Sequence, residues 1–290
     1  MIAQRKGGKI EERDMSGNDF ARLSRLIWEH LGIILGADKK TMLQGRIRKR
    51  MKALGISTYR QYCEYLFSPE GMDDELPQLP SVVTTNKTDF FREPKSFDYL
   101  VDLVLPDLVN HRQIGIKRPL IVWSAGCSTG EEPYTLAMVL NEFAQNNLIL
   151  NFNFTIMASD ISARVLETAE KAIYGLDRIE PVPAVLRRKY LLRSKNPSQK
   201  LVRISPEIRS KITFRRLNLM EDFGIQELVD IIFCRNVIIY FDQSTQEKLF
   251  ERFSRYLIPG GYLFLGHSET IGRACPSFVQ EAPTIYKKAR

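Results

Sequence analysis

The 290-residue sequence is poor in the residue types that cross-link chains or bind transition metals. It has four cysteines and three histidines, which are scattered and show no Cys-x-x-Cys spacing. A disulfide framework is therefore excluded, and we expect no zinc or other metal site. A small number of unpaired thiols is typical of a reducing cytoplasm.

The sequence also lacks a long apolar segment. Its longest candidate, residues 231–241, is interrupted by Arg235 and Asn236, whereas a membrane helix needs ~20 apolar residues. The first residues are charged and contain no apolar core, which is unlike a secretory signal. We expect a cytoplasmic protein without membrane insertion, in which residues 1–15 form a flexible tail.

A chain of this length usually forms roughly two domains. Two different patterns of apolar residues follow the tail, in agreement with this number. Residues 16–85 show apolar residues at helical spacing and predict an all-helical N-terminal domain. A helix predicted over 39–54 carries many of the basic residues that give the chain a net charge of +8. Residues 70–75 are interpreted as an acidic link between helices.

From residue 119 the pattern changes to strands that alternate with helices. This alternation predicts an α/β domain over 119–290, with a mostly parallel sheet and helices on both faces. Residues 86–118 are interpreted as a linker and interdomain helix, and Pro259-Gly260-Gly261 as the end of the last helix. An interruption at about 174–210 predicts a small inserted antiparallel β-subdomain. The expected strands are 120–124, 152–158, 212–217, 228–234 and 262–265, and the expected helices are 97–109, 131–145, 163–171 and 244–257.

The loop after the first strand is the first candidate for a ligand site. Residues 122–134 read VWSAGCSTGEEPY, an order typical of a strand, a tight turn and a helix start. Such a junction directs free N–H groups and a helix dipole toward one point, which favours a nucleotide-type pocket. Only Gly126 and Gly130 are glycines, so the dinucleotide pattern is absent, and the spacing is closer to that of S-adenosylmethionine methyltransferases. A tight turn without any ligand would look much the same.

Polar residues after the later strands are further candidates. Asp160 follows the second strand, where it could bind ribose hydroxyls or cap the next helix. Asn218 could pair with an adenine edge or simply form a turn. Arg235 and Asn236 follow an apolar strand, where unsatisfied polar groups are costly, and this favours a functional role.

Two other elements allow more than one interpretation. Segment 84–93 combines hydroxyls, an amide and an arginine with paired phenylalanines, and it is interpreted as a lid over the ligand or as a capped interdomain helix. Tyr240 could supply a ring and a hydroxyl to the pocket or belong to the core.

Taken together, these motifs resemble those of a known family. In chain order they are TTNKTDFFRE, WSAGCSTGEEPYT, ASDIS, FCRNVIIYF and PGGYLFLGHSE. They closely resemble the chemotaxis receptor methyltransferases, which are CheR-type protein-glutamate O-methyltransferases. The resemblance extends from about Phe20 to Tyr286.

The resemblance implies a fold, a reaction and a partner. The fold is a small helical domain, a Rossmann-like S-adenosylmethionine-dependent methyltransferase sheet and an inserted antiparallel subdomain. The reaction is methylation of receptor glutamates to methyl esters in sensory adaptation, with S-adenosylhomocysteine as the second product and no metal. The partner is the cytoplasmic domain of methyl-accepting chemotaxis receptors. Apart from the resemblance, we expect a monomer by default and no nucleic-acid partner.

The resemblance also assigns residues by matching motif positions. The cofactor contacts it implies are Asn86, Thr88, Arg92, Glu132, Asp160, Asn218, Leu219, Asn236 and Val237. Arg92, Arg235 and Tyr240 are the candidate catalytic residues, and Glu131 is expected to be a solvated neighbour of Glu132. The receptor-facing positions are Lys39, Arg46, Lys49 and Arg50.

Two other functions stay open from the residues alone. The net charge would also suit a nucleic-acid methyltransferase, although no aromatic platform for an extruded base is evident. A non-catalytic S-adenosylmethionine-binding module is the third possibility, and it would be expected to lose polar contact residues.

Overall fold

The computed structural model describes residues 14–272 and 275–289, which divide into two compact units. The smaller unit contains the described residues up to Thr85 together with 240–242. The larger unit begins at Asn86 and contains the rest. Of the predicted tail, residues 1–13 lie outside the described residues.

The smaller unit is helical, and its helices begin and end where the local sequence favours it. The Ser16 hydroxyl accepts the Asp19 N–H at the start of the first helix, and Gly32 ends that helix in the left-handed conformation. The predicted acidic link is wrong, because Ser68 caps a short helix that starts at Pro69. The helices are α1 Gly17–Leu31, α2 Lys40–Leu54, α3 Tyr59–Leu66, α4 Pro69–Asp74 and α5 Leu79–Val83, with 3₁₀ turns η1 Ala37–Lys39 and η2 Leu76–Gln78.

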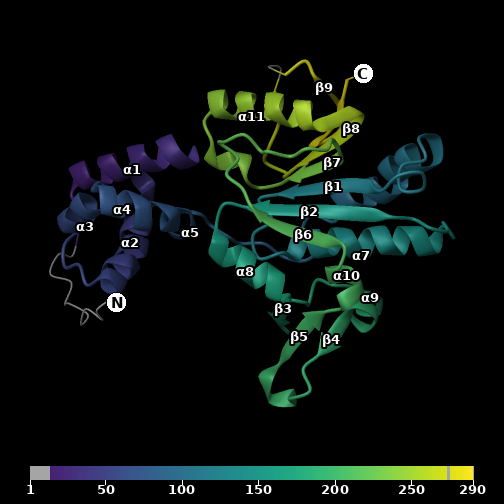
Figure 1. The fold of residues 1–290 in the computed structure, drawn as a ribbon, viewed down its shortest axis with the longest axis horizontal. Helices are drawn as coiled ribbons and strands as arrows, with labels where there is room; N and C mark the ends of the chain where they lie inside the picture. Colours follow the sequence, from purple (N-terminus) through teal and green to yellow (C-terminus); the bar gives the residue numbers. More distant parts are fainter. Residues whose placement is uncertain (1–13, 273–274, 290) are drawn as a thin grey trace. The chain divides into compact units, whose positions relative to one another are not determined.

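The larger unit is built on a seven-stranded sheet in the order β6-β2-β1-β7-β8-β10-β9 (Figure 1). The first five strands in this order are parallel, and β10 and β9 are antiparallel. The predicted α/β fold with a mostly parallel sheet is confirmed. The strands are β1 Leu120–Ala125, β2 Phe154–Asp160, β6 Ile212–Arg216, β7 Val229–Cys234, β8 Leu257–Leu265, β9 Phe278–Ala282 and β10 Ile285–Lys288.

One predicted boundary in this sheet is wrong. Pro259-Gly260-Gly261 do not stand between a helix and a strand, because β8 already begins at Leu257. Val229 of β7 pairs with Leu257, but Ile231 pairs with Tyr262, so β8 carries extra residues at this point. This irregularity accommodates a proline that cannot donate to the sheet.

Helices cover both faces of the sheet, and Figure 1 shows α11 and α7 on opposite sides. On one face Trp123 of β1 contacts Phe253 of α11 edge-on, with ring centroids 5.4 Å apart. On the other face Val122 belongs to a buried cluster that includes residues of α7 and of the helical stretch 95–111. That stretch contains Pro106, which has no N–H to donate, and two π-helical segments. The helices are α6 Lys95–Tyr99, the π segments η3 Leu100–Val104 and η4 Asp107–His111, α7 Glu131–Asn146, α8 Ala163–Lys171 and α11 Gln243–Tyr256, and the short 3₁₀ turn η6 is Ile238–Tyr240.

The inserted subdomain is a three-stranded antiparallel sheet in the order β3-β5-β4. The predicted antiparallel pairing in this insertion is confirmed, since β4 Leu191–Arg193 and β5 Leu201–Ile204 pair in opposite directions. The third strand, β3 Ile173–Gly175, was not predicted, because it is only three residues long and follows α8 almost directly. The subdomain also contains α9 Ala184–Tyr190, η5 Pro197–Gln199 and α10 Pro206–Arg209.

Candidate cofactor site

The site lies where the strand order of the large sheet reverses. The chain passes from β1 to β2 on one side of the sheet, and β7 later pairs with β1 on the other side. Open parallel sheets bind ligands outside the carboxyl ends of the strands at such a switch point. The structure places the candidate residues Asp160, Arg235 and Asn236 at these ends.

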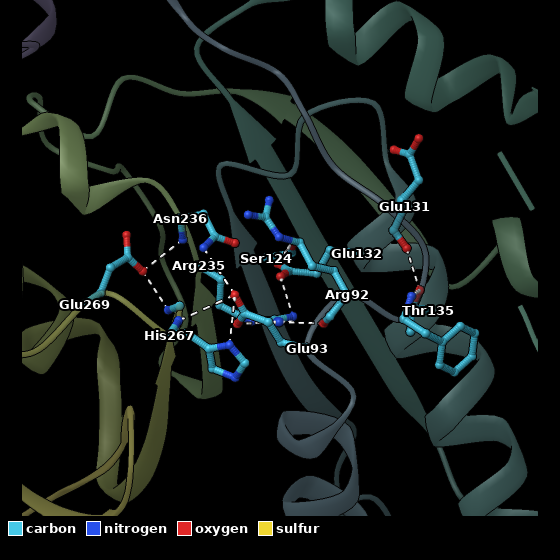
Figure 2. Close-up of polar contacts among 12 residues, drawn as sticks. Arg92, Glu93, Ser124, Glu131, Glu132, Thr135, Arg235, Asn236, His267 and Glu269 are labelled. Atoms are coloured by element: carbon cyan, nitrogen blue, oxygen red, sulfur yellow. Dashed lines mark hydrogen bonds and ion pairs between the residues drawn. The ribbon is translucent and has the colours of Figure 1, made fainter. Parts of the chain in front are cut away.

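A buried ionic network joins the ends of β1 and β7 (Figure 2). The Glu132 carboxylate accepts a hydrogen bond from the Ser124 hydroxyl at 2.8 Å and from the Arg235 guanidinium at 3.3 Å. Arg235 also donates to Glu93 at 2.8 Å and to the backbone carbonyl of Arg92 at 2.5 Å. Glu132, the second residue of α7, is thus held in place from two strands.

Arg235 acts inside this network rather than at its surface. Its side chain is only 2% exposed and lies over the Phe97 ring, 5.4 Å from the centroid. Its Nε has no hydrogen-bond partner among the described residues. The catalytic role expected of Arg235 stays a prediction, whereas a role in positioning Glu132 fits these contacts.

The network carries more negative than positive charge. Two carboxylates, Glu93 and Glu132, face one guanidinium. Burial tends to raise the pKa of Glu93, but hydrogen bonding to Arg235 and its charge lower that pKa below its usual value. Burial raises the pKa of Glu132 despite the opposing effect of Arg235. A cationic group placed beside Glu132 would relieve this cost, so the network suits a positively charged ligand.

Asp160 lies on the other side of β1. It is 8% exposed, and its two carboxylate oxygens accept the backbone N–H groups of Ser128 and Ser162, each at 2.9 Å. Burial raises its pKa, and these N–H groups oppose the rise. The residue at the cap of α8 is Ser162, so the alternative of Asp160 as the helix cap is not supported. Asp160 instead ties the β1–α7 loop to β2.

The same loop lies against the segment that follows β7. Gly126 has φ +81°, and a Cβ at this position would come within 2.4 Å of the Val237 side chain. Ser128 donates its hydroxyl to the backbone carbonyl of Asn86 at 3.0 Å. The glycine therefore allows the two loops to meet, and the serine links the β1–α7 loop to the segment that contains Asn86 and Thr88.

Glu131 is not the solvated neighbour that we expected. It is fully buried, and its carboxylate accepts hydrogen bonds from Arg178 of the inserted subdomain at 2.5 Å and from the Thr129 hydroxyl at 2.7 Å. Arg178 also donates to the carbonyl of Thr88 at 2.7 Å. The two adjacent glutamates thus differ in function, because Glu131 anchors the subdomain while Glu132 lies in the network, with its side chain 14% exposed.

The other expected cofactor residues lie around these contacts. Arg92 is partly exposed, and one guanidinium nitrogen donates to the carbonyl of Lys87 at 3.0 Å. Asn218 and Leu219 follow β6, whose end is joined to Asp160 by the Leu217 N–H. The Asn218 amide bonds Met220 and Glu221, as in a turn. The adenine role of Asn218 therefore stays a prediction.

Tyr240 belongs to the smaller unit, where its carbonyl accepts the N–H of Ile34 at 2.9 Å. Its catalytic role stays a prediction as well. Among the receptor-facing candidates, Arg46 donates to the carbonyls of Val82, Val83 and Thr84 at the end of α5. Arg50 forms a bidentate pair with Glu75, which is 1% exposed.

Those two arginines therefore support the helical unit itself. The lysines of the same region are freer, since Lys49 is exposed and Lys39 pairs only with the neighbouring Asp38 in the described contacts. Any docking surface on α2 would depend more on its lysines than on Arg46 and Arg50.

Sequence reasoning missed four residues of the site: Glu93, Ser124, Arg178 and Glu269. Glu93, Ser124 and Glu269 stand inside the recognised motifs but received no role there. Arg178 lies in the insertion, far from the site in sequence, so no local pattern marks it. Within residues 14–272 and 275–289 no group of His, Cys, Asp and Glu side chains could hold a metal ion.

Comparison with known proteins identifies the family. The family model described as CheR methyltransferase, SAM binding domain, matches residues 86–285. The chain belongs to the CheR methyltransferase family. The CheR methyltransferase all-alpha domain matches residues 18–84, which correspond to the helical unit.

Curated relatives match along nearly the whole chain. It is 37% identical to the chemotaxis protein methyltransferase of Borreliella burgdorferi, over 95% of each chain. It is 36% identical to chemotaxis protein methyltransferase 2 of Pseudomonas aeruginosa, over 96% of each chain. The identity to the Escherichia coli chemotaxis protein methyltransferase is 35%, covering 95% of this chain and 92% of that one. As a CheR family member, the protein is a methyltransferase with an S-adenosylmethionine-binding domain.

Proposed function

We propose that this CheR methyltransferase transfers a methyl group to glutamate side chains in the cytoplasmic domain of chemotaxis receptors, forming methyl esters. It acts in the cytoplasm as a monomer. The observation that carries the proposal is the network with excess negative charge at the switch point, in a chain whose relatives are named chemotaxis protein methyltransferases. No helix among the described residues has the length and apolarity needed to span a membrane.

The residues present suit S-adenosylmethionine, which supplies an electrophilic methyl group when bound. Glu132 would hold the ammonium of its methionine portion, and Arg92 the carboxylate, through charge-assisted hydrogen bonds. Asp160 would accept the ribose hydroxyls with the lone pairs that its backbone contacts leave. The remaining contacts would come from Asn86, Thr88, Asn218, Leu219, Asn236 and Val237.

The chain needs no general base for this reaction. A glutamate side chain has an unperturbed pKa of ~4.3 and is already ionised at neutral pH. The protein's task would be to exclude water and to hold the substrate carboxylate oriented toward the methyl group. Tyr240 would orient the reacting groups, and Arg235 would keep Glu132 ionised and in position.

A labelling experiment tests the function. The protein is incubated with methyl-labelled S-adenosylmethionine and either a receptor cytoplasmic domain or RNA, and the label is then challenged with base. We expect label on the receptor domain that is released by base, as a methyl ester requires. Base-stable label on RNA, or cofactor binding with no transfer to the receptor domain, would refute the proposal.

A further inference from the structure

The segment after β7 is held by a carboxylate from the neighbouring strand's end. Glu269 lies beyond β8 and is 4% exposed. Its carboxylate oxygens accept the backbone N–H groups of Asn236 and Val237 at 2.8 Å each, and of Ile238 at 2.9 Å. They also accept the N–H of Gly266 at 2.6 Å and, at 3.4 Å, that of Ile239. Figure 2 shows Glu269 beside Asn236.

This arrangement fixes a backbone conformation that is otherwise unfavourable. Asn236 has φ +59°, in the left-handed region, and the N–H groups that follow it point toward one spot. Converging N–H groups form an anion site, and here the anion is a side chain of the protein itself. The carboxylate therefore offsets the cost of the left-handed residue and of the buried N–H groups.

The close approach of the two strand ends is a second, independent feature. Cys234 of β7 pairs with Leu265 of β8. A Cβ on Gly266, the next residue, would lie 2.6 Å from Asn236 Nδ2 and 2.8 Å from Asn236 N. Only glycine lets the Glu269 turn come this close to the segment after β7.

We propose that Glu269 is a positioning residue for the cofactor, because it fixes the backbone of 236–239 and so places Asn236 and Val237. The inference rests on the proposed function, in which Asn236 and Val237 contact S-adenosylmethionine. Since Glu269 occupies their N–H groups, this segment offers a ligand its carbonyl oxygens and side chains.

The test compares three variants with the wild-type enzyme by calorimetry with S-adenosylhomocysteine and by receptor methylation. Glu269→Gln replaces one acceptor oxygen with an NH₂ that faces N–H donors, and it is expected to weaken S-adenosylhomocysteine binding by about tenfold or more. Glu269→Asp keeps the charge on a shorter side chain, and its affinity for S-adenosylhomocysteine should lie between those of Glu269→Gln and the wild type. Glu281→Gln, at an exposed position of β9, is the matched control and should leave both measurements unchanged.

The kinetic pattern separates positioning from a merely structural role. Well below the unfolding temperature, the KM for S-adenosylmethionine should rise in Glu269→Gln while the KM for the receptor domain stays unchanged. Wild-type affinity in Glu269→Gln, with only a lower Tm, would overturn the proposal. If Glu269→Gln does not fold, the affinity of Glu269→Asp for S-adenosylhomocysteine is measured instead. Wild-type affinity in Glu269→Asp would also overturn the proposal. A wild-type enzyme that fails to bind S-adenosylhomocysteine would instead overturn the proposed function.

Discussion

Glu131 and Glu132 are adjacent at the start of α7. Removing the charge of Glu132 should mainly weaken cofactor binding, whereas removing the charge of Glu131 should mainly lower stability. Glu132→Gln removes the carboxylate that we assign to the ligand's ammonium. A hydrogen bond to a charged group contributes about 1.5–3 kcal/mol, so S-adenosylhomocysteine affinity should fall about 10- to 150-fold. The amide oxygen can still accept the Ser124 hydroxyl, and Arg235 keeps its pair with Glu93.

The stability of Glu132→Gln should change little. Burial raises the pKa of Glu132 in the folded protein, so the ionised carboxyl costs stability at pH values above that pKa. The neutral amide of Gln removes this cost, which raises the free energy of unfolding. It also loses the hydrogen bond from Arg235, which lowers the free energy of unfolding, so the two effects oppose each other. The free energy of unfolding at neutral pH is therefore expected to fall by no more than about 1 kcal/mol.

Glu131→Gln should show the reverse pattern. The buried carboxylate of Glu131 holds Arg178, whose side chain is 39% exposed and therefore partly screened. Its loss should lower the free energy of unfolding by about 1–3 kcal/mol, with a smaller change in affinity than in Glu132→Gln. Calorimetry and urea unfolding of both variants, with exposed Glu170→Gln as control, measure the two effects. Equal affinity losses in both variants, or none in Glu132→Gln, would refute the assignment.

Further predictions concern the cofactor, its pH dependence and the docking helix. Arg92→Ala and Asp160→Asn should each weaken S-adenosylhomocysteine binding about tenfold or more in calorimetry; unchanged affinity would remove that residue from the site. Burial raises the pKa of both Glu132 and Asp160, so S-adenosylhomocysteine affinity should fall on acidification, and this fall should begin at a higher pH than for ordinary carboxyls. A flat profile down to the pKa of an exposed carboxyl would contradict this. Lys49 and Lys52 are exposed lysines of α2, and Lys49→Glu with Lys52→Glu should raise the KM for the receptor domain several-fold at low salt and spare cofactor affinity. A KM equal to that of the control Lys248→Glu would exclude the lysines of α2 from docking.

The sequence predicted the architecture well because its signals are local. Alternating apolar runs and helix caps depend on nearby residues, and the strands of the parallel sheet lie within a few residues of their predicted positions. The error at Pro259 arose because a proline that usually ends an element is accommodated here by an irregularity in strand pairing.

The partners of charged side chains could not be predicted in this way. Arg46 and Arg50 look alike as exposed charges in the sequence, yet they bond carbonyls of α5 and buried Glu75. Glu131 precedes Glu132 directly, but only Glu131 meets an arginine from the inserted subdomain. Such pairings join residues far apart in the chain, so they require the fold itself.

In the site, too, some residues could be predicted from local sequence and others could not. Motif positions led to Asp160, Arg235 and Asn236, which the structure brings to neighbouring strand ends. Glu269 stands in a Gly-His-Ser-Glu turn that reads as an ordinary loop, and its role depends on the backbone of another strand's end.

Mass-spectrometric mapping of the methylated product shows which side chains the enzyme modifies. A receptor cytoplasmic domain is incubated with the wild-type enzyme and S-adenosylmethionine, and its peptides are fragmented to locate each added methyl group. We expect methyl groups on glutamate side chains only, released by base and strongly reduced with Glu132→Gln. Methyl groups on lysine, arginine or a backbone terminus, or none on any receptor peptide, would contradict it.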